Sequence, residues 1–402
     1  MMYLLFFIAV VFNLFFNTTI PISFGYESGI RTLSFLPMLI YFMINMIAKK
    51  VPLSKEAVCI ILLAVIIIFF KWAIEQNYTY KATLLLIIPM VIFMCFENLT
   101  REELTLLRRI TIFFFIAECG LSIVEWLLKR NLCASPGHFE DVDNIMKWTG
   151  FFKSTSLFGH PLGNAQIVAV FMAFIAVSNF MKKHIQFFLF FLGYVSLFCF
   201  NSRGAILVTT FFTVPYFVWR IIKTAQPGMK WMINFSILCV LLGMFYLVTE
   251  TSMGGRLMGE NLVDSSSKTR LEVFNFHKHY KYKDDLIWGH PDNYDHMMGR
   301  LGAGGVENGV VSVVLEYGIV FTIPLLLLLF RFQYNRLSVY SKSDKWLLLA
   351  VFYIIGNMNP NLSTSIQWTL WIYAYYVFRP ELLPPQTENT GLVDMKLHFR
   401  DE

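Results

Sequence analysis

Charged residues are scarce in this sequence of 402 residues, because Asp, Glu, Lys and Arg together make up only 15% of it. Soluble globular domains carry about 25% charged residues. Hydrophobic residues fill the deficit: they amount to 56% of the chain and include 41 phenylalanines. A soluble fold of this length cannot bury so much apolar surface. The composition therefore excludes a cytosolic enzyme and a disordered chain, and it indicates a multi-span membrane protein.

Cysteine is also sparse and follows no pattern. Six cysteines occur, none of them in a CxxC spacing, and all except Cys133 lie inside apolar runs. The sequence therefore predicts neither a disulfide framework nor a metal cage. Internal repeats and low-complexity tracts are lacking as well. The net charge of +6 suits anionic lipid or an anionic substrate.

Continuous apolar runs, such as residues 60–70, dominate the sequence. They predict spanning helices, since a transmembrane barrel would show short alternating segments. We expect an all-α polytopic membrane protein that forms one integral membrane domain over 1–402. Residues 1–16 are interpreted as a retained span because they lack the basic start of a signal peptide. The expected spans are 2–17, 33–48, 57–73, 82–97, 109–127, 160–180, 185–200, 204–221, 231–249, 309–330, 346–358 (short enough to be re-entrant) and 364–378.

The distribution of Lys and Arg orients these twelve spans. With a cytoplasmic N-terminus, the basic short loops fall inside, and the short outer connections hold only Arg31, Lys71, Lys81 and Arg203. Two larger segments, 128–159 and 250–308, then face outward, and the second contains a surface helix that begins near residue 265. Residues 380–402 form a cytoplasmic tail. The expected inner basic residues are Lys49, Lys50, Lys55, Arg101, Arg108, Arg109, Lys182, Lys183, Arg220, Lys223, Lys230, Arg331, Arg336, Lys342 and Lys345.

Arg203 is the sharpest functional candidate. The seventh span ends near Phe200 and the eighth starts almost at once, so the turn through Asn201 and Ser202 fixes a guanidinium at the outer surface. A guanidinium suits phosphate because its planar fork donates two parallel hydrogen bonds. The alternative is an arginine that only snorkels to the interface.

The late outer segment holds further candidates. Arg270 can join Arg203 on a pyrophosphate, where two cations would stabilise a departing phosphate, or it can lie on a solvated helix face. Glu307 precedes Asn308 at the start of the tenth span. Glu307 can accept a proton from a sugar hydroxyl, or it can serve only as a negative residue at a helix N-terminus. His290 is a rival base.

Two polar positions near other spans complete the candidates. His160 and Asn164 lie one turn apart at the start of the sixth span, where they can line a head-group cavity or form interhelical hydrogen bonds. Glu118 lies near the middle of the fifth span, where a carboxylate is costly. It is the residue that best favours transport, and the structural alternative is a hydrogen bond to a neighbouring helix.

Taken in order, several short motifs resemble the O-antigen ligase and Wzy-type polymerase family of bacterial envelopes. The resemblance covers roughly residues 155–320, and its specificity lies in the order, the spacing and the shared outer face of the motifs. The motifs are Gly159–Gly163, Asn201–Ala205, Ser267–Leu271, Glu307–Gly309 and Glu316–Ile319.

The resemblance implies a GT-C-type glycosyltransferase of the bacterial plasma membrane that polymerises undecaprenyl-pyrophosphate-linked oligosaccharide repeats at the outer face. It implies no metal and no cofactor, because the lipid pyrophosphate is the activated leaving group. Arg203 and Arg270 would bind that pyrophosphate. Many members carry His-Asn where this chain has Glu307-Asn308, so Glu307 either replaces the imidazole as base or only orients the substrate. The implied substrate-binding residues are Asn201, Ser202, His160, Asn164, His290 and Asn308.

The implied partners are membrane lipid, a flippase and a chain-length regulator, with no nucleic acid. Within the same family the alternative is an O-antigen ligase, which transfers a finished glycan to lipid A core. Polymerase is favoured because Glu307 stands where a ligase is expected to carry His. From another class, a lipid-linked oligosaccharide flippase would need repeat symmetry or broken helices in matching halves, and the sequence indicates neither.

Overall fold

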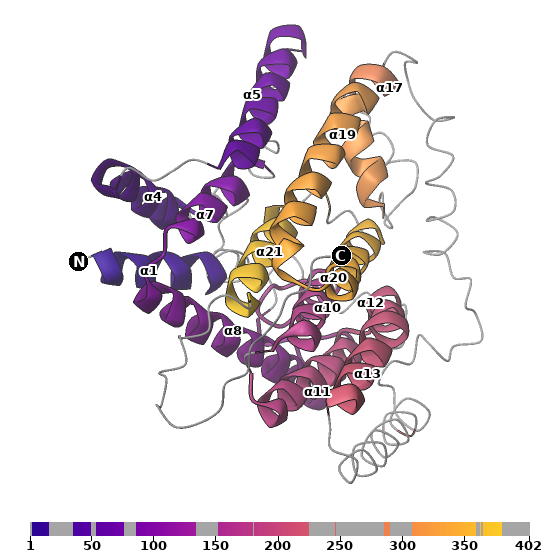
Figure 1. Ribbon diagram of the computed structural model, residues 1–402. Helices are drawn as coiled ribbons and strands as arrows, with labels where there is room; N and C mark the ends of the chain where they lie inside the picture. Colours follow the sequence, from indigo (N-terminus) through magenta and orange to yellow (C-terminus); the bar gives the residue numbers. More distant parts are fainter. Residues whose placement is uncertain are drawn as a thin grey trace, which may run out of the picture.

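The computed structural model describes an all-helical protein (Figure 1). The described residues are 2–15, 35–49, 54–75, 86–133, 152–179, 181–224, 246, 285–289, 308–358, 362 and 365–379. Each expected span coincides with a helix in these residues, except for 231–249, which lies outside them apart from Tyr246. The expected surface helix near residue 265 also lies outside the described residues.

The helices follow one another with short connections wherever the connecting residues are described. In the first half they are α1 (Met2–Phe15), α4 (Leu36–Lys49), α5 (Lys55–Glu75), α7 (Ile88–Glu97), α8 (Arg101–Leu128), α10 (Pro161–Val177) and α11 (Lys183–Phe200). In the second half they are α12 (Arg203–Val208), the π-helical turn η2 (Thr209–Thr213), α13 (Val214–Thr224), α17 (Asp285–Trp288), α19 (Gly309–Arg336), the 3-10 turn η5 (Leu337–Val339), α20 (Lys342–Asn357) and α21 (Ser365–Phe378).

Five helical stretches among the described residues are long and apolar enough to cross a membrane: Lys55–Ala73, Arg101–Leu128, Lys183–Phe200, Arg203–Lys223 and Gly309–Val339. Their outer surfaces are apolar. On α5, for example, Ile66 is 56% exposed and Phe69 is 65% exposed. A continuous apolar surface of this kind is unfavourable in water and suits lipid. The chain is therefore a multi-pass membrane protein.

Local sequence explains where two helices depart from the expected spans. Helix α8 starts at Arg101, ahead of the expected 109, because Thr100 and Glu103 form a capping box. The same Glu103 accepts a hydrogen bond from the Tyr41 hydroxyl at 2.8 Å, which ties α4 to α8. Helix α20 starts at Lys342, four residues before the expected span, because Ser341 caps it by accepting from the Asp344 amide.

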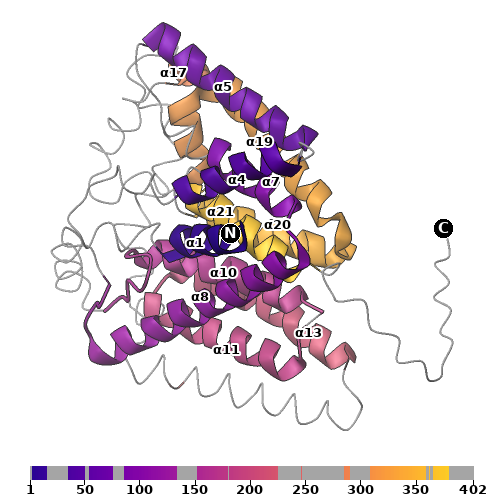
Figure 2. The same ribbon diagram turned by 90° about the vertical axis from the view of Figure 1, so that its left-hand side faces the viewer.

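Helix α10 lies at the centre of the bundle (Figures 1 and 2). Every side chain from Asn164 to Val177 is buried, and the helix contacts α8, α11, α20 and α21. A helix that is apolar on all sides belongs in an interior position. The sequence of α10 therefore explains its place in the fold.

Helix α19 is broken at Gly318, which has the non-helical angles φ 74° and ψ 167°. The hydroxyl of Thr322 donates to the carbonyl of Val313 at 3.2 Å across this break. The short helix α17 packs against the same place, at the top of α19 in Figure 1. The sequence did not predict this interruption, which no proline accompanies at that position.

Side-chain contacts join the helix ends that the sequence assigns to the inner side. Arg220 in α13 pairs with Asp344 in the first turn of α20. Arg336 at the end of α19 pairs with Glu97 at the end of α7. Arg108 near the start of α8 donates to backbone carbonyls at the end of α21, including that of Val377 at 3.1 Å. Three of the basic residues that set the expected orientation, Arg108, Arg220 and Arg336, therefore also fasten neighbouring helices together.

Candidate functional site

Three helices begin beside the C-terminal end of α20, at the bundle end opposite to these ion pairs. In α10, Gln166 Nε2 donates to the carbonyl of Ile355 at 3.3 Å. In α12, a Cβ on Gly204 would lie 2.7 Å from the sulfur of Met358. In α19, the amide of Val310 donates to Oδ1 of Asn357 at 3.1 Å. The N-termini of α10, α12 and α19 therefore share one neighbourhood.

Arg203 occupies the first position of α12, directly after the turn in which the sequence predicts it. Helix α11 ends at Phe200, and only Asn201 and Ser202 separate it from α12. Asn201 adopts the left-handed conformation at φ 53° and ψ 41°, which asparagine tolerates better than most residues, and Ser202 is extended. The Arg203 side chain is partly buried. A cation at a helix N-terminus adds to the positive end of the helix dipole, so this position attracts an anion.

The side-chain amide of Asn201 is buried and has no hydrogen-bond partner among the described residues. The residue is 1% exposed, and both Oδ1 and Nδ2 lack a partner. The same holds for Oε1 of Gln166 and Oδ1 of Asn164. A buried polar group without a partner costs about 1–3 kcal/mol. Several such groups at one end of the bundle indicate a place that water or a polar ligand fills.

Asn308 lies at this end of the bundle as the N-cap of α19. Its Oδ1 accepts from the amide of Val311 at 2.9 Å, and its backbone carbonyl accepts from the amide and the hydroxyl of Ser312. The side chain is nearly buried. The structure therefore gives this predicted substrate-binding residue a clear role in starting the helix.

His160 and Asn164 are both ordered by the turn that precedes α10. His160 is the N-cap and accepts from the Gly163 amide on Nδ1 at 3.3 Å, while its side chain is exposed. Asn164 is fully buried and donates to the carbonyl of Thr155. These hydrogen bonds of Asn164 and His160 therefore hold the 155–163 segment together. They do not join two helices, whereas the sequence offered interhelical hydrogen bonds as an alternative.

Two buried carboxylates of α8 hold the segment 152–158 inside the bundle end. Glu125 accepts five hydrogen bonds: on Oε1 from the amides of Leu132 and Cys133, and on Oε2 from Ser154 Oγ and the amides of Thr155 and Ser156. Glu118, two turns earlier, accepts one from the amide of Leu157 at 3.1 Å. The sequence singled out Glu118 for transport, whereas its hydrogen bond here goes to a loop. The importance of Glu125 was missed, although its seven-residue spacing from Glu118 places both on one face.

We expect Glu125→Gln to destabilise the protein much more than Glu118→Gln. A glutamine presents an NH₂ group to one of the two sets of donors that Glu125 now accepts, so at least two hydrogen bonds to a charged group are lost at about 1.5–3 kcal/mol each. In Glu118, one oxygen already lacks a partner among the described residues, so the amide replaces it at little cost. Thermal unfolding of both variants in detergent measures the difference. Equal unfolding temperatures would contradict the assignment.

Residues 285–289, part of the segment that the sequence predicts to face outward, are fastened to the bundle through Lys71, which the sequence marked only as an outer basic residue. Lys71 is fully buried and donates to the carbonyls of Trp288, at 2.9 Å, and of Gly289. The ring of Trp288 stacks on Phe70 with a centroid distance of 5.1 Å. Gly289 and Gly318 both have φ 74°, and a Cβ on either would lie within 2.3 Å of backbone atoms of the other segment. Helix α17 is therefore held between α5 and the break in α19.

Arg270, His290 and Glu307 lie outside the described residues. Two of them have a described neighbour in the sequence: Gly289 precedes His290, and Asn308 follows Glu307. Of the predicted site residues, the structure brings Asn201, Ser202, Arg203, His160, Asn164 and Asn308 to the same end of the bundle.

Comparison of the chain with protein-family models, with curated proteins and with solved structures finds no match.

Proposed function

We propose that this protein is a membrane glycosyltransferase that polymerises undecaprenyl-pyrophosphate-linked oligosaccharide repeats at the outer face of a bacterial plasma membrane. The observation that carries the proposal is the position of Arg203. It is held at the start of α12 by a two-residue turn, next to a buried Asn201 amide without a partner among the described residues. A phosphate oxygen is an acceptor that both side chains can bind.

In the proposed reaction, a hydroxyl oxygen of one lipid-linked repeat attacks the anomeric carbon of the sugar on another. The new glycosidic bond forms as the bond between that carbon and the pyrophosphate oxygen breaks, and undecaprenyl pyrophosphate leaves. Arg203 and Arg270 stabilise the charge that grows on the leaving group. Glu307 accepts the hydroxyl proton or orients the acceptor. His160, His290, Asn164, Ser202 and Asn308 then line or shape the place where the two repeats meet.

The twelve-span, GT-C-like topology belongs to the same proposal. Arg220 and Arg336, at helix ends that the sequence places inside, form ion pairs with carboxylates of neighbouring helices, while Arg203 and the starts of α10 and α19 meet at the other end. Chemistry on a lipid-linked sugar chain requires this separation, because the pyrophosphate stays at the membrane surface while the glycan extends into the aqueous phase.

Two alternatives have their own distinguishing observations. An O-antigen ligase would bind the donor pyrophosphate in the same way and would use lipid A core as the acceptor. A lipid-linked oligosaccharide flippase is favoured by one feature, the break of α19 at Gly318, since transporters often bind substrate where a spanning helix is interrupted. The π-helical turn η2 interrupts the spanning stretch Arg203–Lys223, and it does not mirror the break.

We expect the purified protein, reconstituted into liposomes with one defined undecaprenyl-linked repeat, to produce a ladder of longer glycans and to release undecaprenyl pyrophosphate. Mass spectrometry of the lipid-linked products measures chain length. Addition of lipid A core as acceptor is the control for the ligase. Movement of the unaltered repeat across the bilayer without any new glycosidic bond would reject the polymerase in favour of the flippase.

A further inference from the structure

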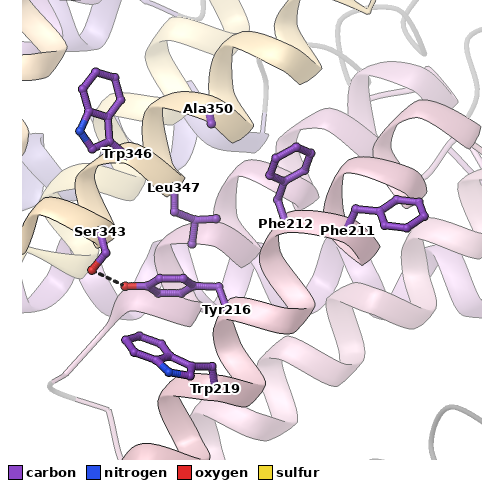
Figure 3. A pocket seen from close by; sticks show the side chains of 8 residues that line it. All are labelled: Phe211, Phe212, Tyr216, Trp219, Ser343, Trp346, Leu347 and Ala350. Atoms are coloured by element: carbon purple, nitrogen blue, oxygen red, sulfur yellow. Dashed lines mark hydrogen bonds between the residues drawn. The ribbon is translucent and has the colours of Figure 1, made fainter.

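A groove lies on the flank of the bundle between η2–α13 and α20. Its volume is about 430 Å³. Figure 3 shows aromatic side chains on both walls. The wall from η2 and α13 carries Phe211, Phe212, Tyr216 and Trp219, and the wall from α20 carries Ser343, Trp346, Leu347 and Ala350.

The groove opens toward the surroundings of the bundle. Phe211 is 71% exposed, and Trp219 and Trp346 are each about half exposed. The π-helical turn η2 places Phe211 and Phe212 next to each other on this surface, and Tyr194 on α11 fixes the turn through a 2.8 Å hydrogen bond with Thr210. Exposed aromatic rings on a spanning helix are in contact with lipid chains.

The chemistry of the groove changes along its length. One end, at Phe211, Phe212 and Ala350, is apolar. The other end is polar, because the Tyr216 hydroxyl donates to Asp344 at 2.6 Å and contacts the Ser343 hydroxyl at 3.2 Å. In Figure 3 the Tyr216 ring reaches across the groove toward Ser343. The ligand that fits must therefore have a long apolar part and a polar head at the Ser343 end.

Two lysines adjoin lining residues at the polar end. The ammonium group of Lys223 lies 5.1 Å from the centre of the Trp219 ring, and exposed Lys342 directly precedes Ser343. Among the lining residues and their hydrogen-bond partners, Asp344 is the one acidic side chain at this end. Asp344 already pairs with Arg220. The local charge is therefore positive, and it complements an anionic head group.

We propose that this groove binds an anionic phospholipid of the surrounding bilayer, with an acyl chain along Phe212 and Leu347 and the phosphate between Lys223 and Lys342. The inference rests on the proposed function only where it excludes that function's donor lipid. The donor lipid of that function is a poor occupant, because its pyrophosphate belongs at Arg203, at the opposite end of the same span from Lys223. The bound phospholipid belongs to the leaflet on the side of the basic inner loops.

Native mass spectrometry of the detergent-purified protein tests this inference. The protein is mixed with equal amounts of phosphatidylglycerol and phosphatidylcholine that carry the same acyl chains. We expect preferential retention of phosphatidylglycerol. The double variant Lys223→Glu/Lys342→Glu should lose about tenfold in phosphatidylglycerol affinity and leave phosphatidylcholine unchanged, because each lysine near a membrane surface contributes appreciably to anionic lipid binding. Ala350→Trp fills the groove and should reduce the retention of both lipids.

The matched control reverses two exposed basic residues at the same bundle end on other helices, Lys55→Glu/Arg109→Glu. It changes the net charge equally and should leave phosphatidylglycerol retention at the wild-type level. An equal loss in the control pair, or full retention in Ala350→Trp, overturns the inference. Displacement of phosphatidylglycerol by an equal amount of undecaprenyl pyrophosphate also overturns it, because the groove would then belong to the donor lipid.

Discussion

Replacement of Arg203 by alanine is expected to abolish long glycan chains while the protein still inserts into the membrane. The guanidinium is the one described cation at the start of α12, and in the proposed reaction it stabilises the departing pyrophosphate. Loss of one such donor typically lowers the catalytic rate about 100–1000-fold. Arg203→Lys keeps the charge and loses the planar fork, so it should also fail to support long chains. Glycan length in cells and the rate of the reconstituted reaction measure both variants.

The control for Arg203 is Arg109→Ala, which removes an exposed arginine from the other end of the bundle. Its chain length should match that of the wild type. A polymer of normal length in both Arg203 variants would refute the assignment.

A companion variant, Asn201→Gly, distinguishes a binding role of the Asn201 side chain from the role of this residue in the turn. Glycine accepts the left-handed conformation of Asn201, and the variant removes an amide that has no partner among the described residues. Stability should therefore stay within about 1 kcal/mol of the wild type, since no described hydrogen bond of the side chain is lost. If the amide binds the donor, elongation falls while the unfolding temperature does not. Unchanged elongation would remove Asn201 from the proposed site.

Gly318→Ala is expected to separate α17 from α19 and to lower the stability of the protein. The angles φ 74° and ψ 167° belong to a region that is essentially restricted to glycine, and the backbone strain alone costs about 1–3 kcal/mol in other residues. In addition, the new Cβ would lie 2.3 Å from the carbonyl oxygen of Ile287. Neither backbone can move without breaking the contact between the two helices.

Two measurements follow the Gly318 variant: thermal unfolding in detergent, and the rate at which trypsin cleaves the 250–308 segment. We expect a lower unfolding temperature and faster cleavage. Gly120→Ala is the matched control, because that glycine lies within α8 and a Cβ there meets no atom within 4 Å. It should leave stability unchanged or raise it slightly, as alanine favours helix. Identical behaviour of the two variants would contradict the close packing of α17 on α19.

The helices could be predicted from the sequence because each span must satisfy its own backbone hydrogen bonds. Each span therefore corresponds to one continuous apolar run in the sequence. The bounds were less accurate where polar residues extend a helix beyond the apolar run. Thr100 and Ser341 are examples, since each caps a helix that starts several residues before its apolar part. The position of Arg203 followed from sequence because only two residues separate the adjacent helices.

The partners of polar side chains could not be predicted in the same way. Glu125 lies seven residues after Glu118, but only the folded chain brings residues 152–156 back to it. The fully buried position of Lys71 depends on α17, which is more than 200 residues away in sequence. The break at Gly318 arises from the same tertiary contact, because Gly289 requires a neighbour without a side chain. Long-range pairings of this kind leave no periodic signal in a single sequence.

The anchoring of α17 also bears on where the chain can vary in length and sequence. Gly289 is locked against Gly318, and Asn308 begins α19, whose Val310 amide donates to Asn357 of α20, so the two residues that bracket positions 290–307 are both held by the helix bundle. For a flexible connection between two fixed points, each doubling in length costs only about 0.6 kcal/mol. We therefore expect the helices on either side to tolerate changes in length or sequence between positions 290 and 307 at low cost to folding.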